Sequence, residues 1–457
     1  MKMTITEELQ AAPVSVHSQT ASAGEAEASQ TRLIRNLIWL YLILWLIEGG
    51  LRRWVLPGLA SPLLLIRDPL VIVIYCLAAS YNLFPANGFV VWGTFLGLLS
   101  FVNAMMLGHG NFFVAFYGVR CDFLHVPLIF IMGKVLREKD IMALARVAVW
   151  IAIPYTALLV AQFYQPQDAW VNRGVGNSGE GAGFSGALDR FRPPGTFSFI
   201  TGPSQLYPLL TACWFTLLLA RKLPLWIMIG SAGAILISIP ISISRTLFLS
   251  VAIVVITGLG AMCSGGRLIK LLVQFAVVGL ILTWLASQSM VFRDGMEAFS
   301  ARWEAATTDA GGFQEAIVDR MLGAMFGAFA GIEGFGAGTG FSTNVGQQLV
   351  AQHVGFGGSE AEWGRLLFDN GLALGSLLVG YRIILTGAIV LAALSAWQRG
   401  SPQGLIFASS CTLMILAGPW GQTTTLGFAA LGGGLTLAAS RCVAPLVPQT
   451  RSEPYSV

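Results

Sequence analysis

Apolar runs long enough to cross a bilayer recur along most of this 457-residue chain. A membrane-spanning helix needs roughly 20 apolar residues, and only helices and closed barrels satisfy the backbone within lipid. Charged residues make up 11% of the chain, whereas soluble proteins carry roughly 25%. The sequence therefore predicts an all-α, polytopic membrane protein.

The apolar runs predict about twelve spanning helices. We expect them near residues 33–51, 63–80, 89–107, 112–136, 141–163, 203–220, 224–243, 246–263, 268–287, 371–397, 404–419 and 423–440. We keep 371–397 as one helix although Arg382 interrupts it, because either half is too short to cross the bilayer.

Both ends of the chain are polar. Residues 1–30 are rich in Ala, Ser and Glu and lack a cleavable-signal pattern, so we expect a disordered cytoplasmic tail. Residues 31–440 would form the helical transmembrane domain, and 441–457 a second cytoplasmic tail.

Basic residues in short loops indicate the orientation of a polytopic protein. If the twelve helices alternate, Arg137, Arg221, Arg441 and all five lysines fall on one side, which is then cytoplasmic. The long polar segments 164–202 and 288–364 share the opposite, outer face. The larger, partly helical segment precedes the last three helices.

The outer face is basic only through arginine. A guanidinium binds phosphate or carboxylate through two parallel hydrogen bonds, which an ammonium cannot do. We interpret six outer arginines as candidates for anion binding: Arg190, Arg192, Arg245, Arg302, Arg320 and Arg365. The alternative is an arginine-rich composition, since the chain holds 22 Arg against five Lys.

Some charged residues lie inside the expected helices, where charge normally faces a bundle interior or a cavity. We interpret Arg120 and Asp122 as a structural pair within one helix, and His125 as a packed histidine. Arg382, midway along a helix, would be costly unless it snorkels to the membrane surface or has a partner, which the sequence does not identify. A set near the first outer loop is read mostly as fold-forming ion pairs: Glu48, Arg52, Arg53, Arg67 and Asp68.

The segment SEAEWGRLLFDNGLALG (359–375) carries the most specific local pattern. It places Glu360, Glu362 and Arg365 before an expected helix, with Glu362 and Arg365 on one face. One interpretation is a solvated helix start whose acids favour the positive helix end. The other is a general base at the outer surface, supplied by Glu360 or Glu362.

Motifs of several enzyme classes are missing from the sequence. It contains no Walker A, HExxH, Asp-x-Asp or GxSxG pattern, and its six cysteines show no CxxC spacing. The net charge of +4 is too small to indicate nucleic-acid binding. We therefore expect no metal and no cofactor, and an already activated substrate if the protein is an enzyme.

The layout resembles the O-antigen ligase and O-antigen polymerase family of bacterial envelopes, which has a large outer loop near its C-terminal end. Counting back from Gly371, Asp369 occupies the family's acidic position, and Glu360 stands where the ligases have histidine. Arg320 and Gly331 are similar to the Arg-x10-Gly signature of the polymerases. The glutamate favours a relative that polymerises or transfers another glycan over a lipid-A-core ligase.

The resemblance implies a metal-independent glycosyltransferase of the bacterial inner membrane, with its site on the periplasmic face. The donor would be a polyprenyl-diphosphate-linked oligosaccharide lying against membrane lipid and helices, and the acceptor a sugar hydroxyl. Outer arginines hold the lipid pyrophosphate in this family, a role implied here for Arg192, Arg245, Arg302 and Arg320. A flippase and a chain-length regulator are the expected partners.

Two other functions stay open. A transporter of a small anion such as bicarbonate would depend on charges near the bilayer midplane, namely Arg120, Asp122, His125 and Arg382. A non-catalytic scaffold of an envelope assembly would tolerate neutral substitutions at Arg192, Arg302 and Glu360.

Overall fold

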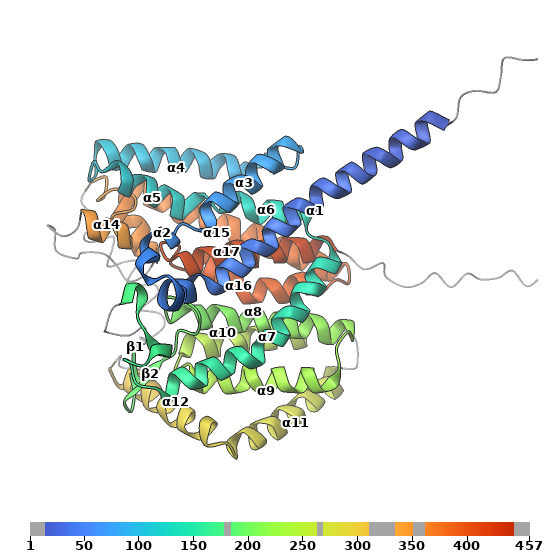
Figure 1. Ribbon diagram of the computed structural model, residues 1–457, viewed down its shortest axis with the longest axis vertical. Helices are drawn as coiled ribbons and strands as arrows, with labels where there is room; N and C mark the ends of the chain where they lie inside the picture. The colour runs from blue at the N-terminus through green and yellow to red at the C-terminus, as the bar shows by residue number, and fades with distance from the viewer. Residues whose placement is uncertain (1–13, 178–183, 263–267, 310–333, 351–361, 443–457) are drawn as a thin grey trace, which may run out of the picture.

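The computed structural model describes residues 14–177, 184–262, 268–309, 334–350 and 362–442. These residues are almost entirely helical, with one short two-stranded hairpin among them (Figure 1). The all-α prediction is confirmed.

The elements of the N-terminal half are α1 (Val14–Gly50), η1 (Leu51–Val55), η2 (Pro57–Leu59), α2 (Ala60–Leu63), α3 (Arg67–Ser80), α4 (Gly88–Met106), α5 (Phe112–Phe123), α6 (Val126–Val135) and α7 (Glu138–Tyr164). Two short turns and a hairpin follow: η3 (Trp170–Asn172), η4 (Val175–Asn177), β1 (Phe184–Ala187) and β2 (Arg190–Arg192). The remaining helices are α8 (Thr201–Ala220), α9 (Leu225–Ile241), α10 (Arg245–Met262), α11 (Leu268–Ser287), α12 (Met290–Asp309), α14 (Asn344–Leu349), α15 (Glu362–Gln398), α16 (Gln403–Ala417) and α17 (Thr423–Arg441).

Within the described residues, seven helical segments are long and apolar enough to cross a membrane: Thr31–Val55, Pro57–Ser80, Gly88–Met106, Phe112–Val135, Glu138–Tyr164, Arg245–Met262 and Glu362–Gln398. Two shorter helices, α9 and α16, are also apolar. Large apolar side chains such as Trp92, Phe113 and Ile256 are exposed on the helices, as expected for surfaces that contact lipid. The structure is consistent with a membrane protein, and the count of twelve crossings stays a prediction.

The outer segments predicted to share a face meet in the structure. The hairpin and α14 lie at one end of the helical bundle, opposite the start of α1 and the end of α17 (Figure 1). Helix α12 packs against β1, and Arg302 Nη1 donates to the Gly186 carbonyl at 3.1 Å. This contact joins segment 164–202 to segment 288–364.

The N-terminal region differs from its prediction. Residues 14–30, expected to belong to a disordered tail, form the first part of α1. Alanine and glutamate recur in this stretch, and both are strong helix formers. The other residues of the two predicted tails, 1–13 and 443–457, lie outside the described residues.

The helix expected over 112–136 is broken, so His125 lies at a junction between α5 and α6 and not inside one helix. Pro127 lacks an N–H group and disfavours helical geometry in the residue before it. The Tyr75 hydroxyl enters the break, donating to the Leu124 carbonyl at 2.6 Å and accepting from the Leu128 N–H at 3.0 Å. This insertion satisfies backbone groups that the break would otherwise leave unpaired.

A second break lies in α15 at Gly371, whose φ of 75° and ψ of 173° are not helical. A Cβ atom at this position would lie 2.6 Å from the Phe335 carbonyl carbon, so the position requires glycine. Beside the break, the Ala337 and Gly338 N–H groups donate to the Phe368 and Asp369 carbonyls at 3.0 and 2.7 Å. The glycine-rich segment 334–343 is thereby fixed against α15.

Candidate functional site

Two groups of charged side chains stand out in the described structure. The first, which we call the buried ion network, joins α5 to α15: Asp122, Glu362, Arg365, Asp369 and Arg382. The second, which we call the hairpin arginines, lies beside β1 and β2: Arg190, Arg192, Arg245 and Arg302.

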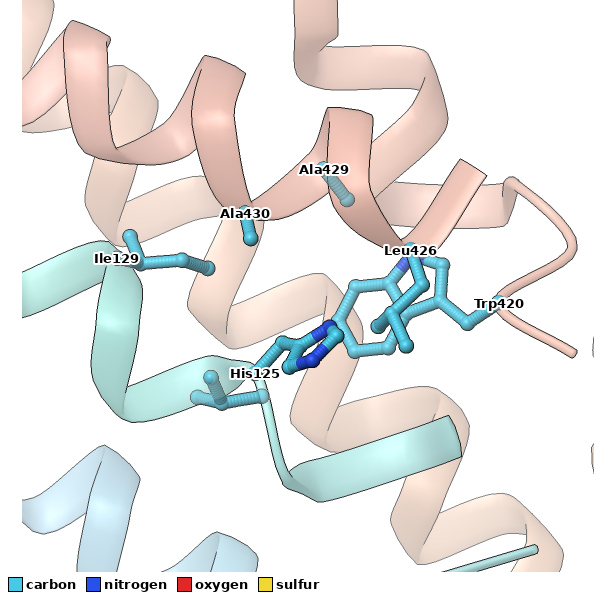
Figure 2. A pocket seen from close by; sticks show the side chains of 7 residues that line it. His125, Ile129, Trp420, Leu426, Ala429 and Ala430 are labelled. Carbon is cyan, nitrogen blue, oxygen red and sulfur yellow. The ribbon is translucent and has the colours of Figure 1, made fainter. Parts of the chain in front are cut away.

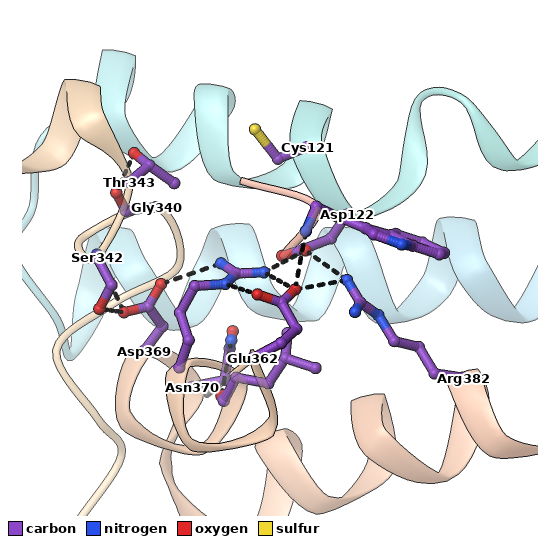
Figure 3. A network of polar contacts seen from close by, with 12 residues as sticks. Cys121, Asp122, Gly340, Ser342, Thr343, Glu362, Asp369, Asn370 and Arg382 are labelled. Carbon is purple, nitrogen blue, oxygen red and sulfur yellow. Dashed lines mark hydrogen bonds and ion pairs between the residues drawn. The ribbon is translucent and has the colours of Figure 1, made fainter. Parts of the chain in front are cut away.

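Arg365 lies at the centre of the buried ion network, and three carboxylates surround it (Figure 3). Its Nε and Nη2 donate to both oxygens of Glu362 at 2.8 Å. Nη2 also donates to Asp122 Oδ1 at 2.6 Å, and Nη1 to Asp369 Oδ2 at 3.4 Å. Because the guanidinium is saturated by protein carboxylates, it has little capacity left for a substrate pyrophosphate.

The same network supplies the partner of Arg382. Its Nη2 donates to Glu362 Oε1 at 2.7 Å, and its Nη1 to the Gly418 carbonyl at 3.0 Å. The guanidinium carbon also lies 3.8 Å from the centre of the Trp420 ring. The loop between α16 and α17 therefore supplies a backbone carbonyl and an aromatic ring to Arg382 of α15.

The predicted pair of Arg120 with Asp122 is wrong. Residues two apart on a helix do not face each other, and Arg120 instead donates to both oxygens of Asp68 at 2.7 Å. Asp122 pairs with Arg365, 243 positions away. The predicted proximity of Glu362 and Arg365 is confirmed, because three residues form less than one helical turn.

The fold-forming ion pairs near the first outer loop are largely present. Glu48 lies 3.0 Å from Arg67 and 3.7 Å from Arg52. Arg53 differs, since within the described residues its side chain donates hydrogen bonds to backbone carbonyls, including those of Arg173 and Gly195, and to no carboxylate. It joins the end of α1 to the loop that leads into α8.

His125 borders a small pocket whose other lining residues are mainly apolar, among them Ile129, Trp420 and Leu426. Figure 2 shows the imidazole beside the Trp420 indole. The His125 Nδ1 lies 3.4 Å from the Tyr41 hydroxyl, and Nε2 lies 3.4 Å from Asp68 Oδ1. These contacts agree with the interpretation of a packed histidine.

Three of the hairpin arginines converge from separate elements. Arg192 ends β2, Arg245 begins α10 and Arg302 lies on α12. Burial, together with the positive charges of Arg302 and Arg245, lowers the pKa of Arg192 to about 10. Arg192 therefore stays charged at pH 7 beside two other cations.

Local structure places these side chains. Leu188 and Asp189 both adopt positive φ, at 51° and 56°, the geometry of a tight hairpin turn. The turn after α9 places Arg245 at the first position of α10, where Ser244 Oγ accepts from the Leu247 N–H at 3.3 Å. The hairpin and the start of α10 thus place Arg192 and Arg245 at one end of the bundle.

The two arginine environments differ in charge compensation. Arg365 and Arg382 contact carboxylates at 3.6 Å or less. Within the part of the chain that the structure describes, Arg192 and Arg245 form no ion pair, and the buried Arg192 Nε has no hydrogen-bond partner. An anion fits the hairpin arginines better than the buried ion network.

Arg190, the fourth hairpin arginine, packs against aromatic rings at the end of α7. Its guanidinium carbon sits 5.2 Å from the Phe163 ring centre and 4.9 Å from that of Tyr164. The Tyr164 hydroxyl in turn donates to Asp294 Oδ2 on α12 at 2.8 Å. Sequence reasoning did not identify this carboxylate, because only the fold brings α12 against the end of α7.

The predicted site residues thus separate into three sets. Arg192, Arg245 and Arg302 come together, with Arg190 nearby. Glu362 and Arg365 belong to the buried ion network, while Arg320 and Glu360 lie outside the described residues. The described residues contain no group of three or more His, Cys, Asp or Glu side chains arranged to hold a metal ion.

Comparison with known proteins finds no family model and no curated protein that matches this chain. Its function must therefore be argued from the site itself.

Proposed function

We propose that the protein transfers a glycosyl group from a polyprenyl-diphosphate-linked oligosaccharide to an acceptor sugar hydroxyl. It would act as a surface polysaccharide polymerase or an O-antigen ligase-like enzyme, on the outer face of a bacterial inner membrane. The observation that carries this proposal is the convergence of Arg192, Arg245 and Arg302, where Arg192 and Arg245 form no ion pair with any residue that the structure describes.

The chemistry requires stabilisation of a departing diphosphate. As the bond between the sugar carbon and the phosphate oxygen breaks, the electron pair moves to the diphosphate. Fixed cations beside that oxygen lower the barrier, because they favour the charge that develops there. The unpartnered Nε of Arg192 is a buried donor available for such an oxygen.

Aromatic side chains beside the arginines suit a lipid-linked donor. Phe248, one turn after Arg245, lies 6.1 Å from Phe299 and 6.3 Å from Trp303, measured between ring centres. Phe299 and Trp303 flank Arg302 on α12. Cations next to an apolar surface match a ligand whose charged head continues into a hydrocarbon tail.

The acceptor hydroxyl must lose a proton to a carboxylate. Glu362 is a poor candidate, because it already accepts from two arginines and from the Trp420 N–H. Glu360 remains the base that the resemblance to O-antigen ligases and polymerases implies. Asp294 is the alternative that the structure adds, since Tyr164 connects it to Arg190.

Transport of a small anion such as bicarbonate has weaker support. Arg120, Arg365 and Arg382 lie in the helical interior, but each faces protein carboxylates. A transported anion would have to displace them. Loss of function in Asp122→Ala would not separate the two functions, because Asp122 helps to hold α5 against α15.

The test is in vitro transfer with purified protein, in which release of polyprenyl diphosphate from the lipid-linked oligosaccharide is measured. We expect Arg192→Gln and Arg302→Gln each to reduce the rate by about tenfold or more, the cost of one charge-assisted hydrogen bond. Arg293→Gln is the matched control, since Arg293 is exposed on the same helix as Arg302. Unchanged rates in both variants would contradict the proposal and favour the scaffold.

A further inference from the structure

The buried ion network has unequal numbers of positive and negative groups. It contains three carboxylates and two guanidinium groups, so its formal charge over the described residues is −1. All five side chains are at most 7% exposed. An uncompensated charge is costly in such a place, and an additional positive charge would remove the imbalance.

Hydrogen bonding distinguishes the three carboxylates. Glu362 accepts four hydrogen bonds: two from Arg365, one from Arg382 and one from the backbone N–H of Trp420. Asp369 accepts from Arg365 and from both the N–H and the hydroxyl of Ser342. In both groups, each carboxylate oxygen therefore accepts at least one hydrogen bond.

Asp122 is different, because one oxygen carries all of its ion pairs. Oδ1 lies 2.6 Å from Arg365 and 3.6 Å from Arg382. Among the described residues, Oδ2 has no hydrogen-bond partner, and the residue is only 4% exposed. Asp122 Oδ2 is therefore a carboxylate oxygen of the network that can accept an additional positive charge.

Other charged or titratable groups near Asp122 do not compensate it. Arg120, on the same helix, is occupied by Asp68 of α3. Cys121 accepts from Arg120, and His125 faces Asp68. From α15, the facing groups are those of the network itself.

Two more unpartnered oxygens belong to segments that border the network. They are Thr339 Oγ1 and Asn370 Oδ1. Thr339 passes beside Gly118, one turn before Asp122 on α5, and Asn370 follows Asp369. Amide and hydroxyl oxygens of this kind have lone pairs that can coordinate a small cation.

We propose that Asp122 Oδ2 binds one exchangeable monovalent cation, either a proton or Na⁺. Occupancy brings the network to zero net charge. Asp369 accepts hydrogen bonds from both Arg365 and Ser342. Cation binding that stabilises the network would therefore also stabilise the packing of the glycine-rich segment 334–343 on α15. This inference does not depend on the glycosyl-transfer proposal.

The decisive variant is Asp122→Asn, with the melting temperature of the detergent-solubilised protein as the measurement. The amide keeps an oxygen for Arg365 and carries no charge, so it reproduces the occupied site. We expect its Tm at neutral pH to equal or exceed that of the wild type. Glu362→Gln is the comparison that removes the same charge. We expect its Tm to fall, because both Glu362 oxygens accept from arginine N–H groups and the amide NH2 would face one of these donors.

Two titrations identify the cation. If a proton binds, the folded state holds more protons than the unfolded state, so the wild-type Tm falls as pH rises. If Na⁺ binds, the wild-type Tm rises with Na⁺ at constant ionic strength in choline buffer. Asp122→Asn should abolish whichever response the wild type shows.

Three results would overturn the proposal. The first is a wild-type Tm that responds to neither pH nor Na⁺. The second is a response that persists in Asp122→Asn. The third is an Asp122→Asn variant that loses as much stability as Glu362→Gln, since Asp122 would then be an ordinary ionised partner.

Discussion

Arg365 Nη2 lies 2.6 Å from Asp122 Oδ1, and this buried pair ties α15 to α5 across 243 residues of sequence. On α15 the contact lies six residues before the break at Gly371, and Arg365 also donates to Asp369, which accepts from Ser342. Through Arg365 and Asp369, the network therefore contacts Ser342 and helps to position segment 334–343 against α15. Arg192 and Arg245, on β2 and α10, form no ion pair within the described residues.

Replacement of Arg365 by methionine should be strongly destabilising. The change leaves three buried carboxylates without their shared cation, and breaking a buried pair in this way costs about 3–5 kcal/mol. Thermal unfolding in detergent measures the effect. Arg293→Met is the control and should be nearly neutral, because Arg293 is exposed. Equal Tm values for the two variants would show that the network contributes little to stability.

The helices were predictable from sequence because their signal is local. Each expected apolar range coincides with helical segments of the structure, and the spacing of Glu362 and Arg365 was enough to predict their contact. Both inferences use only residues within a few turns of each other.

Long-range partners were not predictable in this way. Arg382 contacts the Trp420 ring in the loop after α16, and Arg120 pairs with Asp68 on α3. Arg192, Arg245 and Arg302 were identified by residue type and predicted face. Their convergence depends on how β1 packs on α12, which no local pattern encodes.

Substitution of Gly371 by alanine should destabilise the fold by about 1–3 kcal/mol, because a side chain is strained at its φ of 75°. The added Cβ would also press on the Phe335 backbone. Gly387→Ala on the same helix is the matched control, since nothing lies within 4 Å of its Cβ position. Alanine is the better helix former, so we expect this control to gain about 0.5–1 kcal/mol. Chemical unfolding of both variants checks the opposite signs.

Tyr75→Phe should weaken the α5–α6 junction. Loss of the hydroxyl leaves the Leu124 carbonyl and the Leu128 N–H without their shared partner. Burying such groups unsatisfied costs about 1–3 kcal/mol. Hydrogen exchange at Leu128 and the Tm are the two measurements. Slow exchange and an unchanged Tm in the variant would mean that the break closes into a regular helix.

Anion binding at the hairpin arginines should depend on pH through Arg192. Its pKa is lowered to about 10, so the guanidinium is charged at pH 7 and loses its proton as pH rises through that value. Deprotonation removes a cation from the site, and affinity for inorganic pyrophosphate, used as a probe, should fall between pH 9 and about 10.5. Because a bound anion favours the charged form of Arg192, it would shift this fall in affinity to higher pH. In Arg192→Gln the affinity should be lower at pH 7, and the part of the pH dependence due to Arg192 should vanish. A pH profile identical in the variant and the wild type would show that Arg192 does not contact the anion.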